Sequence, residues 1–154
     1  MATQNSKHKA AIPNSLLKPL SRLVGEWDVV GIHRLLADTL HGQATFEWLE
    51  GGAFLRMLWK IEAPEIPDAI AIFGSDDATE GYFMLYFDER DVSRKYEMTL
   101  SDKAWKYWRD APGFSQRFTG TFADDGNLIN GVWGLSEDDS TWKRDVELTY
   151  TRVK

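Results

Sequence analysis

The sequence predicts an all-β protein: a closed antiparallel up-and-down β-barrel of about ten strands with a short N-terminal helical turn. Two observations lead to this fold class. Apolar and polar residues alternate with period 2 through most of the chain after Gly25, and runs of turn-forming residues separate the alternating segments. No long helical pattern offers a crossover connection, so consecutive strands pair antiparallel, and closure removes the exposed edges of so many strands.

The order of the elements follows from the same patterns. Residues 1–12 are expected to form a disordered N-terminal tail, and residues 13–154 a single barrel domain. The segment "SLLKPLSRLVG" predicts a short helical element that Pro19 interrupts and Gly25 ends. The ten predicted strands are Glu26–Leu35, Gly42–Leu49, Ala53–Glu62, Ala69–Gly74, Tyr82–Phe87, Ser93–Leu100, Ala104–Arg109, Ser115–Ala123, Leu128–Ser136 and Thr141–Val153. The segment "DDGN" at 124–127, between the eighth and ninth predicted strands, is the strongest hairpin signal in the chain.

Alternation also predicts which face of each strand points inward. In "AWKYWR" at 104–109, Lys106 marks the outer face, so Trp105, Tyr107 and Arg109 are expected inside and Trp108 outside. Trp108 is therefore a candidate for contact with a second chain, and a homodimer stays open. In the last strand, the predicted inner set is Trp142, Arg144, Val146, Leu148, Tyr150 and Arg152, although one bulge would reverse part of such a set.

Composition narrows the class of protein. The chain has 154 residues, no cysteine and a formal net charge of −6. The acidic balance and scattered basic residues disfavour nucleic-acid binding, and no apolar run is long enough for a membrane span. The polar N-terminus lacks the apolar region of a secretory signal, so we expect a cytoplasmic protein.

Several motifs carry a resemblance to a known superfamily. Gly25-Glu26-Trp27, which follows a helical turn at the head of the first strand, resembles the G-x-W opening of the calycins, a group that includes lipocalins, fatty-acid-binding proteins and nitrobindin-like proteins. "LEGGAFL" at 49–55 and "FTGTFADDG" at 118–126 resemble small bacterial lipocalin-like proteins. The resemblance implies a ten-stranded barrel in which Arg152, in "LTYTR", covers Trp27. It does not imply haem binding, because nitrobindin-like proteins use a late histidine and this chain has none after His41.

Inward-facing arginines and aromatic residues are the candidate site. A buried guanidinium needs a carboxylate, carbonyls, water or an anionic ligand, and an arginine beside aromatic rings suits a small apolar molecule that bears a carboxylate. For Arg94 and Arg109, internal pairing with Asp or Glu is an equally weighted alternative. The candidate ligand-binding residues are Trp59, Arg94, Tyr96, Trp105, Tyr107, Arg109 and Trp133.

No enzyme motif, metal site or cofactor site is predicted. The pair His33 and His41, with Asp38 nearby, makes only a minimal metal site imaginable, and two histidines at a barrel rim are the better interpretation. The preferred function is therefore binding of a small hydrophobic or aromatic ligand inside the barrel. In one form of this hypothesis the ligand also carries a negative charge. The alternative is an isomerase, cyclase or lyase that acts on a hydrophobic substrate in the same cavity. A barrel filled by its own side chains would instead act through its surface.

Overall fold

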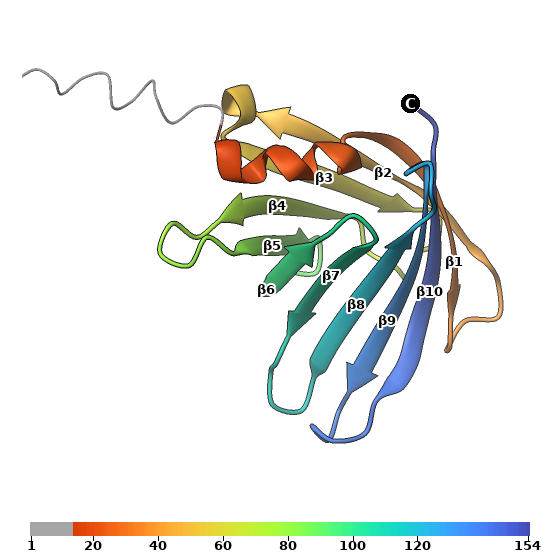
Figure 1. The fold of residues 1–154 in the computed structure, drawn as a ribbon. Helices are drawn as coiled ribbons and strands as arrows, with labels where there is room; N and C mark the ends of the chain where they lie inside the picture. Colours follow the sequence, from red (N-terminus) through yellow and green to blue (C-terminus); the bar gives the residue numbers. More distant parts are fainter. Residues whose placement is uncertain (1–13) are drawn as a thin grey trace, which may run out of the picture.

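The alternating segments fold into ten antiparallel strands in the computed structural model, which describes residues 14–154 (Figure 1). The strands are β1 (Gly25–His33), β2 (Leu40–Leu49), β3 (Phe54–Ile61), β4 (Ala69–Ser75), β5 (Tyr82–Asp88), β6 (Val92–Leu100), β7 (Ala104–Arg109), β8 (Ser115–Phe122), β9 (Leu128–Ser136) and β10 (Lys143–Arg152). A short 3-10 turn, η2 (Glu50–Gly52), joins β2 to β3. All ten predicted strands are present. The predicted disordered tail, residues 1–12, lies outside the described residues.

Each strand pairs with its neighbours in the chain, and the sheet closes on itself. β1 pairs with β10, so that Trp27 lies opposite Arg152 and His33 lies opposite Val146. Closure gives every strand two partners, which removes the open edges that a ten-stranded sheet would otherwise expose. The predicted closed up-and-down barrel is therefore confirmed.

The predicted helical turn is a 3-10 helix, η1 (Ser15–Leu23), that contains Pro19. The Asn14 side chain caps it by accepting a hydrogen bond from the backbone N–H of Leu16 at 3.0 Å. Its apolar side, made of Leu17, Leu20 and Leu23, is fully buried. Figure 1 shows η1 lying across one end of the barrel, where the chain also ends. This end is closed.

Arg152 fastens the closed end. Its guanidinium carbon lies 4.2 Å from the centre of the Trp27 ring, and its two terminal nitrogens donate to the carbonyls of Arg22 and Val24. Trp27 Nε1 donates to the Leu23 carbonyl at 2.9 Å. The covering of Trp27 by Arg152, expected from the calycin resemblance, is confirmed in this geometry.

Aromatic side chains fill the half of the interior next to η1. Trp105 is completely buried there, with its ring centre 5.1 Å from that of Phe118, 5.9 Å from Phe46 and 6.3 Å from Phe73. Edge-to-face contacts of this kind stabilise a core beyond the area they bury. The cavity described below lies toward the opposite end of the barrel.

The predicted faces hold except at the start of β10. Lys106 is exposed, as expected, and Trp105 and Tyr107 are buried. The ladder between β9 and β10 shifts register between Arg144 and Val146, and this bulge reverses the faces before it. The inward prediction for Trp142 and Arg144 is therefore wrong. Arg144 is exposed, and Trp142 packs outside the barrel with the Arg117 guanidinium 3.7 Å from its ring centre.

Candidate ligand-binding cavity

A cavity of about 290 Å³ occupies the end of the barrel opposite η1. Its walls come from strand ends on that side, for example His33 at the end of β1 and Gln116 near the start of β8. Glu65, Ile66 and Pro67 in the β3–β4 loop also line it, as does Phe114 before β8. The volume is close to the lower limit of small-molecule sites, so a compact ligand fits it better than a long one.

The deeper walls are aromatic. Trp59, Tyr107, Trp133 and Tyr150 line this part of the cavity. The Tyr107 and Trp133 ring centres lie 5.1 Å apart, and those of Trp59 and Tyr150 lie 6.1 Å apart. These rings pack on one another and on the filled half of the barrel, so they present a rigid and mostly apolar surface to a ligand.

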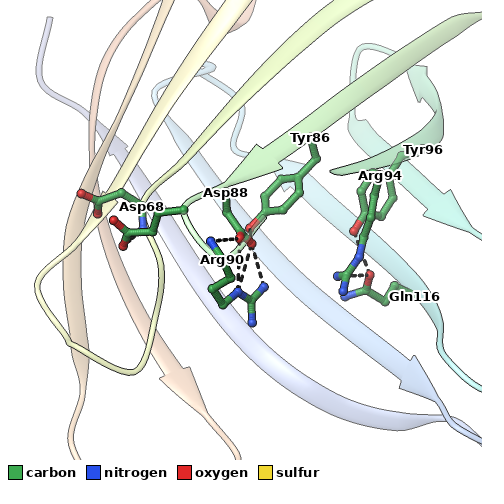
Figure 2. A network of polar contacts seen from close by, with 8 residues as sticks. Asp68, Tyr86, Asp88, Arg90, Arg94, Tyr96 and Gln116 are labelled. Atoms are coloured by element: carbon green, nitrogen blue, oxygen red, sulfur yellow. Dashed lines mark hydrogen bonds and ion pairs between the residues drawn. The ribbon is translucent and has the colours of Figure 1, made fainter. Parts of the chain in front are cut away.

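An arginine with only neutral hydrogen-bond partners lies on one wall. Arg94 Nη1 donates to Gln116 Oε1 at 3.3 Å, and the Tyr96 hydroxyl donates to the same oxygen at 2.8 Å (Figure 2). The Arg94 guanidinium carbon lies 5.1 Å from the ring centre of Phe114. Among residues 14–154, no carboxylate lies within ion-pair distance of Arg94. Its charge therefore has hydrogen-bond partners but no counter-ion.

A second arginine of the cavity is neutralised. The Arg90 guanidinium donates to both carboxylate oxygens of Asp88, with Nη2 2.7 Å from Oδ2, and the Tyr86 hydroxyl donates to Oδ2 at 2.8 Å (Figure 2). The Asp88 side chain is inaccessible to solvent. The hydrogen bonds from Arg90, followed in size by those of its backbone and of Tyr86, outweigh burial and lower the pKa of Asp88 to about 2. Asp88 is thus ionised at neutral pH and compensated by Arg90.

His33 and Asp145 lie at the cavity rim. His33 Nε2 is 4.0 Å from Asp145 Oδ1, and that oxygen accepts a hydrogen bond from Arg34 Nε at 2.8 Å. His33 Nδ1 accepts the backbone N–H of Leu35 at 3.1 Å. Because Nδ1 is used as an acceptor, the neutral imidazole carries its hydrogen on Nε2. The Nε2–H group of His33 is therefore available as a hydrogen-bond donor.

The four tyrosines of the cavity keep their protons. Burial raises the pKa of Tyr86, Tyr96, Tyr107 and Tyr150, and the nearby charges of Arg94 and Arg109 offset only part of this rise at Tyr96. At neutral pH each phenol is a hydrogen-bond donor rather than a base.

Five of the seven residues predicted as ligand contacts line this cavity, namely Trp59, Arg94, Tyr96, Tyr107 and Trp133. Trp105 and Arg109 do not. Trp105 lies deeper, in the filled half of the barrel, where the rings of Phe46, Phe73 and Phe118 pack against it. Arg109 ends β7 on the inner face, beyond the residues that form the wall.

Other lining residues were not among the predicted contacts. Period 2 could have found Tyr86 and Gln116, since each lies two residues from a buried residue on the same face of its strand, Met84 and Phe118, and Tyr150 belonged to a predicted inner face. Arg90 lies in "DERD", which has only the signature of a turn. Asp145 turns inward because of the β10 bulge, and the sequence pattern gives no signal for it.

Metal-ligating side chains do not gather in the described part of the chain. Residues 14–154 contain no group of three His, Cys, Asp or Glu side chains able to hold a metal ion. His41 lies opposite Val30 and is exposed, whereas His33 lines the cavity, so the two histidines lie on different faces of the sheet. Over the same residues, no helix has the length and apolar character needed to cross a membrane.

Comparison with known proteins supports the fold. No family model and no curated protein matches this chain. Among solved structures, the chain is similar to Rv2717c from M. tuberculosis, with a TM-score of 0.66 and 10% identity over 91% of this chain and 98% of that one. It is also similar to the S-type phycobiliprotein lyase CPES from Guillardia theta, with a TM-score of 0.60 and 13% identity over 98% of both chains. At these identities the likeness establishes a shared barrel fold and does not assign a family.

Proposed function

We propose that this protein binds a small hydrophobic or aromatic molecule with an anionic group, such as a carboxylate, inside the open half of its barrel. The observation that carries the proposal is Arg94, a guanidinium on the wall of an aromatic cavity with no counter-ion among the described residues. A buried or half-buried charge without a counter-ion is costly, and an anionic ligand would compensate it.

The contrast between two arginines supports this assignment. Arg90 also lines the cavity, but the carboxylate of Asp88 already neutralises its guanidinium through bidentate hydrogen bonds. Arg94 is held by Gln116 and oriented by the ring of Phe114, which leaves part of its donor fork free for a ligand. The anionic group is therefore placed at Arg94, and the apolar body of the ligand against Trp59, Tyr107 and Trp133.

The polar groups of the cavity favour binding over catalysis. An isomerase, cyclase or lyase needs a positioned base, but the hydrogen-bond network gives His33 a proton on Nε2 and burial keeps the tyrosines protonated. The support for the enzyme alternative is then limited to the fold that this chain shares with a phycobiliprotein lyase. Binding requires only the cavity, the rings and the arginine.

Substitution of Arg94 tests the proposal. Arg94→Met keeps the length of the side chain and removes its charge. Isothermal titration calorimetry with cinnamate and its neutral isostere cinnamamide should show a loss of about ten- to a hundredfold for cinnamate and little change for cinnamamide. Arg109→Met, which removes a charge outside the cavity wall, should have a smaller effect, and the exposed Arg144→Met none. Equal losses for both ligands in Arg94→Met would contradict an anion-binding role.

Native mass spectrometry of the protein purified from its own host can detect a bound ligand directly. The expected result is a retained small molecule with an acidic group, released on denaturation. Protein that carries no molecule and binds neither probe would contradict the proposed function as a whole.

A further inference from the structure

The hydroxyl groups of the four cavity tyrosines differ in their partners. Near the mouth, the Tyr86 hydroxyl donates to Asp88 and the Tyr96 hydroxyl donates to Gln116, each at 2.8 Å. Deeper in the cavity, the hydroxyls of Tyr107 and Tyr150 make no hydrogen bond with any residue from 14 to 154. Two phenol groups at the floor of the cavity thus have no hydrogen-bond partner within the described part of the chain.

These two hydroxyls face the cavity. Both residues line it, although their exposed fractions are only 4% for Tyr107 and 2% for Tyr150. The fully enclosed side-chain polar atoms that lack a partner in the described chain are Arg56 Nε and Trp105 Nε1. The phenol oxygens of Tyr107 and Tyr150 are not in that set, so they keep contact with the open space rather than being sealed between rings.

Packing prevents the two tyrosines from turning toward other partners. The Tyr107 ring stacks on Phe118 at 4.5 Å between ring centres and meets Trp133 at 5.1 Å. The Tyr150 ring is held between Trp105 and Trp59, each 6.1 Å away. The electrostatic effect of Tyr150 on the pKa of Tyr107 is consistent with two neighbouring groups. The floor therefore holds a fixed pair of hydrogen-bond donors.

We infer that the ligand carries a second polar oxygen, at the end opposite its anionic group, and that this oxygen accepts a hydrogen bond from Tyr107 or Tyr150. The inference rests on the proposed binding function and narrows its ligand class. Arg94 holds the anionic end near the mouth, the aromatic walls take a flat ring, and the two phenols select a hydroxyl or carbonyl on the far side of that ring. A hydroxy- or oxo-substituted ring acid meets all three conditions within about 290 Å³. An unsubstituted ring acid or an alkyl acid would leave the two donors unsatisfied, which disfavours it.

Pairs of acids that differ only in the distal hydroxyl test this inference. The probes are 4-hydroxybenzoate, 4-hydroxyphenylacetate and 4-hydroxycinnamate, each compared by calorimetry with the acid that lacks the hydroxyl. The three differ in the distance between ring and carboxylate, so the series covers the unknown span of the site. For at least one pair, the hydroxylated acid should bind the wild-type protein about tenfold more tightly.

Two isosteric variants locate the effect. Tyr107→Phe and Tyr150→Phe keep the rings, and one of them, or the double variant, should abolish the preference for the hydroxylated acid without weakening the binding of its unsubstituted partner. Neither substitution should lower the stability of the ligand-free protein, because neither hydroxyl bonds to a residue between 14 and 154. The control is Tyr82→Phe, which removes the hydroxyl that donates to Leu16 at 2.7 Å near the closed end and should leave the preference unchanged.

The outcomes separate the two proposals. If the acids bind through Arg94 but no pair shows a preference for the hydroxyl, or if the preference persists in the double variant, the inference about the distal oxygen is wrong and the binding function stands. If none of the six acids binds the wild-type protein, the molecule retained in native mass spectrometry decides: no retained molecule overturns both proposals, and a retained acid without a second polar oxygen overturns only the inference about the distal oxygen.

Discussion

Asp88 illustrates how a turn residue becomes part of a site. It ends β5, directly before the tight connection to β6, where a carboxylate commonly caps a turn. Its Oδ1 does accept the backbone N–H of Arg90 at 2.9 Å, as a cap would. The same carboxylate also receives the Arg90 guanidinium and the Tyr86 hydroxyl, which fixes both side chains at the cavity wall.

The pKa of Asp88 predicts how stability depends on pH. Because folding lowers this pKa from 3.8 to about 2, the contribution of Asp88 is fully present above about pH 4 and is lost as the pH falls toward 2. Asp88→Asn should lower the free energy of unfolding at pH 7 by about 1 kcal/mol, since the partner Arg90 is half exposed, and should flatten the decline below pH 4. Urea denaturation over a pH series measures both. The exposed Asp102→Asn is the control, and an unchanged acid slope in Asp88→Asn would contradict the assignment.

Individual site residues could be predicted where period 2 is uninterrupted. Trp59, Tyr96 and Trp133 line the cavity because each occupies an inner position of a regular strand. The predicted inward face failed for Arg144, which was not a predicted ligand contact, because a single bulge in β10 reverses the faces before it and nothing in the sequence marks that bulge. Alternation predicts which residues point inward but not how far each lies from the closed end of the barrel. Trp105 was therefore expected to contact the ligand.

Elements were predictable in number, and local hydrogen bonds of backbone and side chains decide where they end. The first strand was expected to reach Leu35 but ends at His33, where the N–H of Leu36 turns back to the His33 carbonyl. The last strand was expected from Thr141 but begins at Lys143, because Asp138 accepts the N–H groups of Ser140 and Thr141 and holds the turn. Such local caps cannot be read from alternation.

Two glycines of β9 provide a matched test of packing at the level of one element. A Cβ atom at Gly131 would lie 2.6 Å from the Phe118 ring, whereas one at Gly134 would find its nearest neighbour, the Trp142 ring, at 3.5 Å. Gly131→Ala should lower the free energy of unfolding by about 1–3 kcal/mol, because Phe118 is locked by its aromatic neighbours. Gly134→Ala should be neutral or slightly stabilising. Urea denaturation of both variants measures the difference, and similar effects would contradict the close packing at Gly131.

At the scale of the whole molecule, Arg152 joins the two ends of the barrel wall. It covers Trp27 and donates to the carbonyls of Arg22 and Val24, so it connects β10 to η1 and to the start of β1. Arg152→Ala should lower the free energy of unfolding by about 2–3 kcal/mol, because these hydrogen bonds involve a charged donor. Arg144→Ala, an exposed arginine on the same strand, should change it by less than about 0.5 kcal/mol.

Thermal unfolding monitored by near-ultraviolet circular dichroism checks this prediction. The signal reports the environment of the tryptophans, so an early loss in Arg152→Ala would reveal opening of the closed end before the barrel unfolds. If Arg152→Ala and Arg144→Ala melt alike, Arg152 does not fasten that end.

The same connection has a consequence for biosynthesis. The guanidinium of Arg152 binds carbonyls 128 and 130 residues earlier in the chain, and β1 has no second neighbour until β10 exists. A ribosome needs on the order of ten seconds to add that many residues. Throughout this interval β1 carries an unpaired strand edge, which leaves the nascent chain open to aggregation or to capture by a chaperone. The barrel therefore completes its fold only after its last strand has been made.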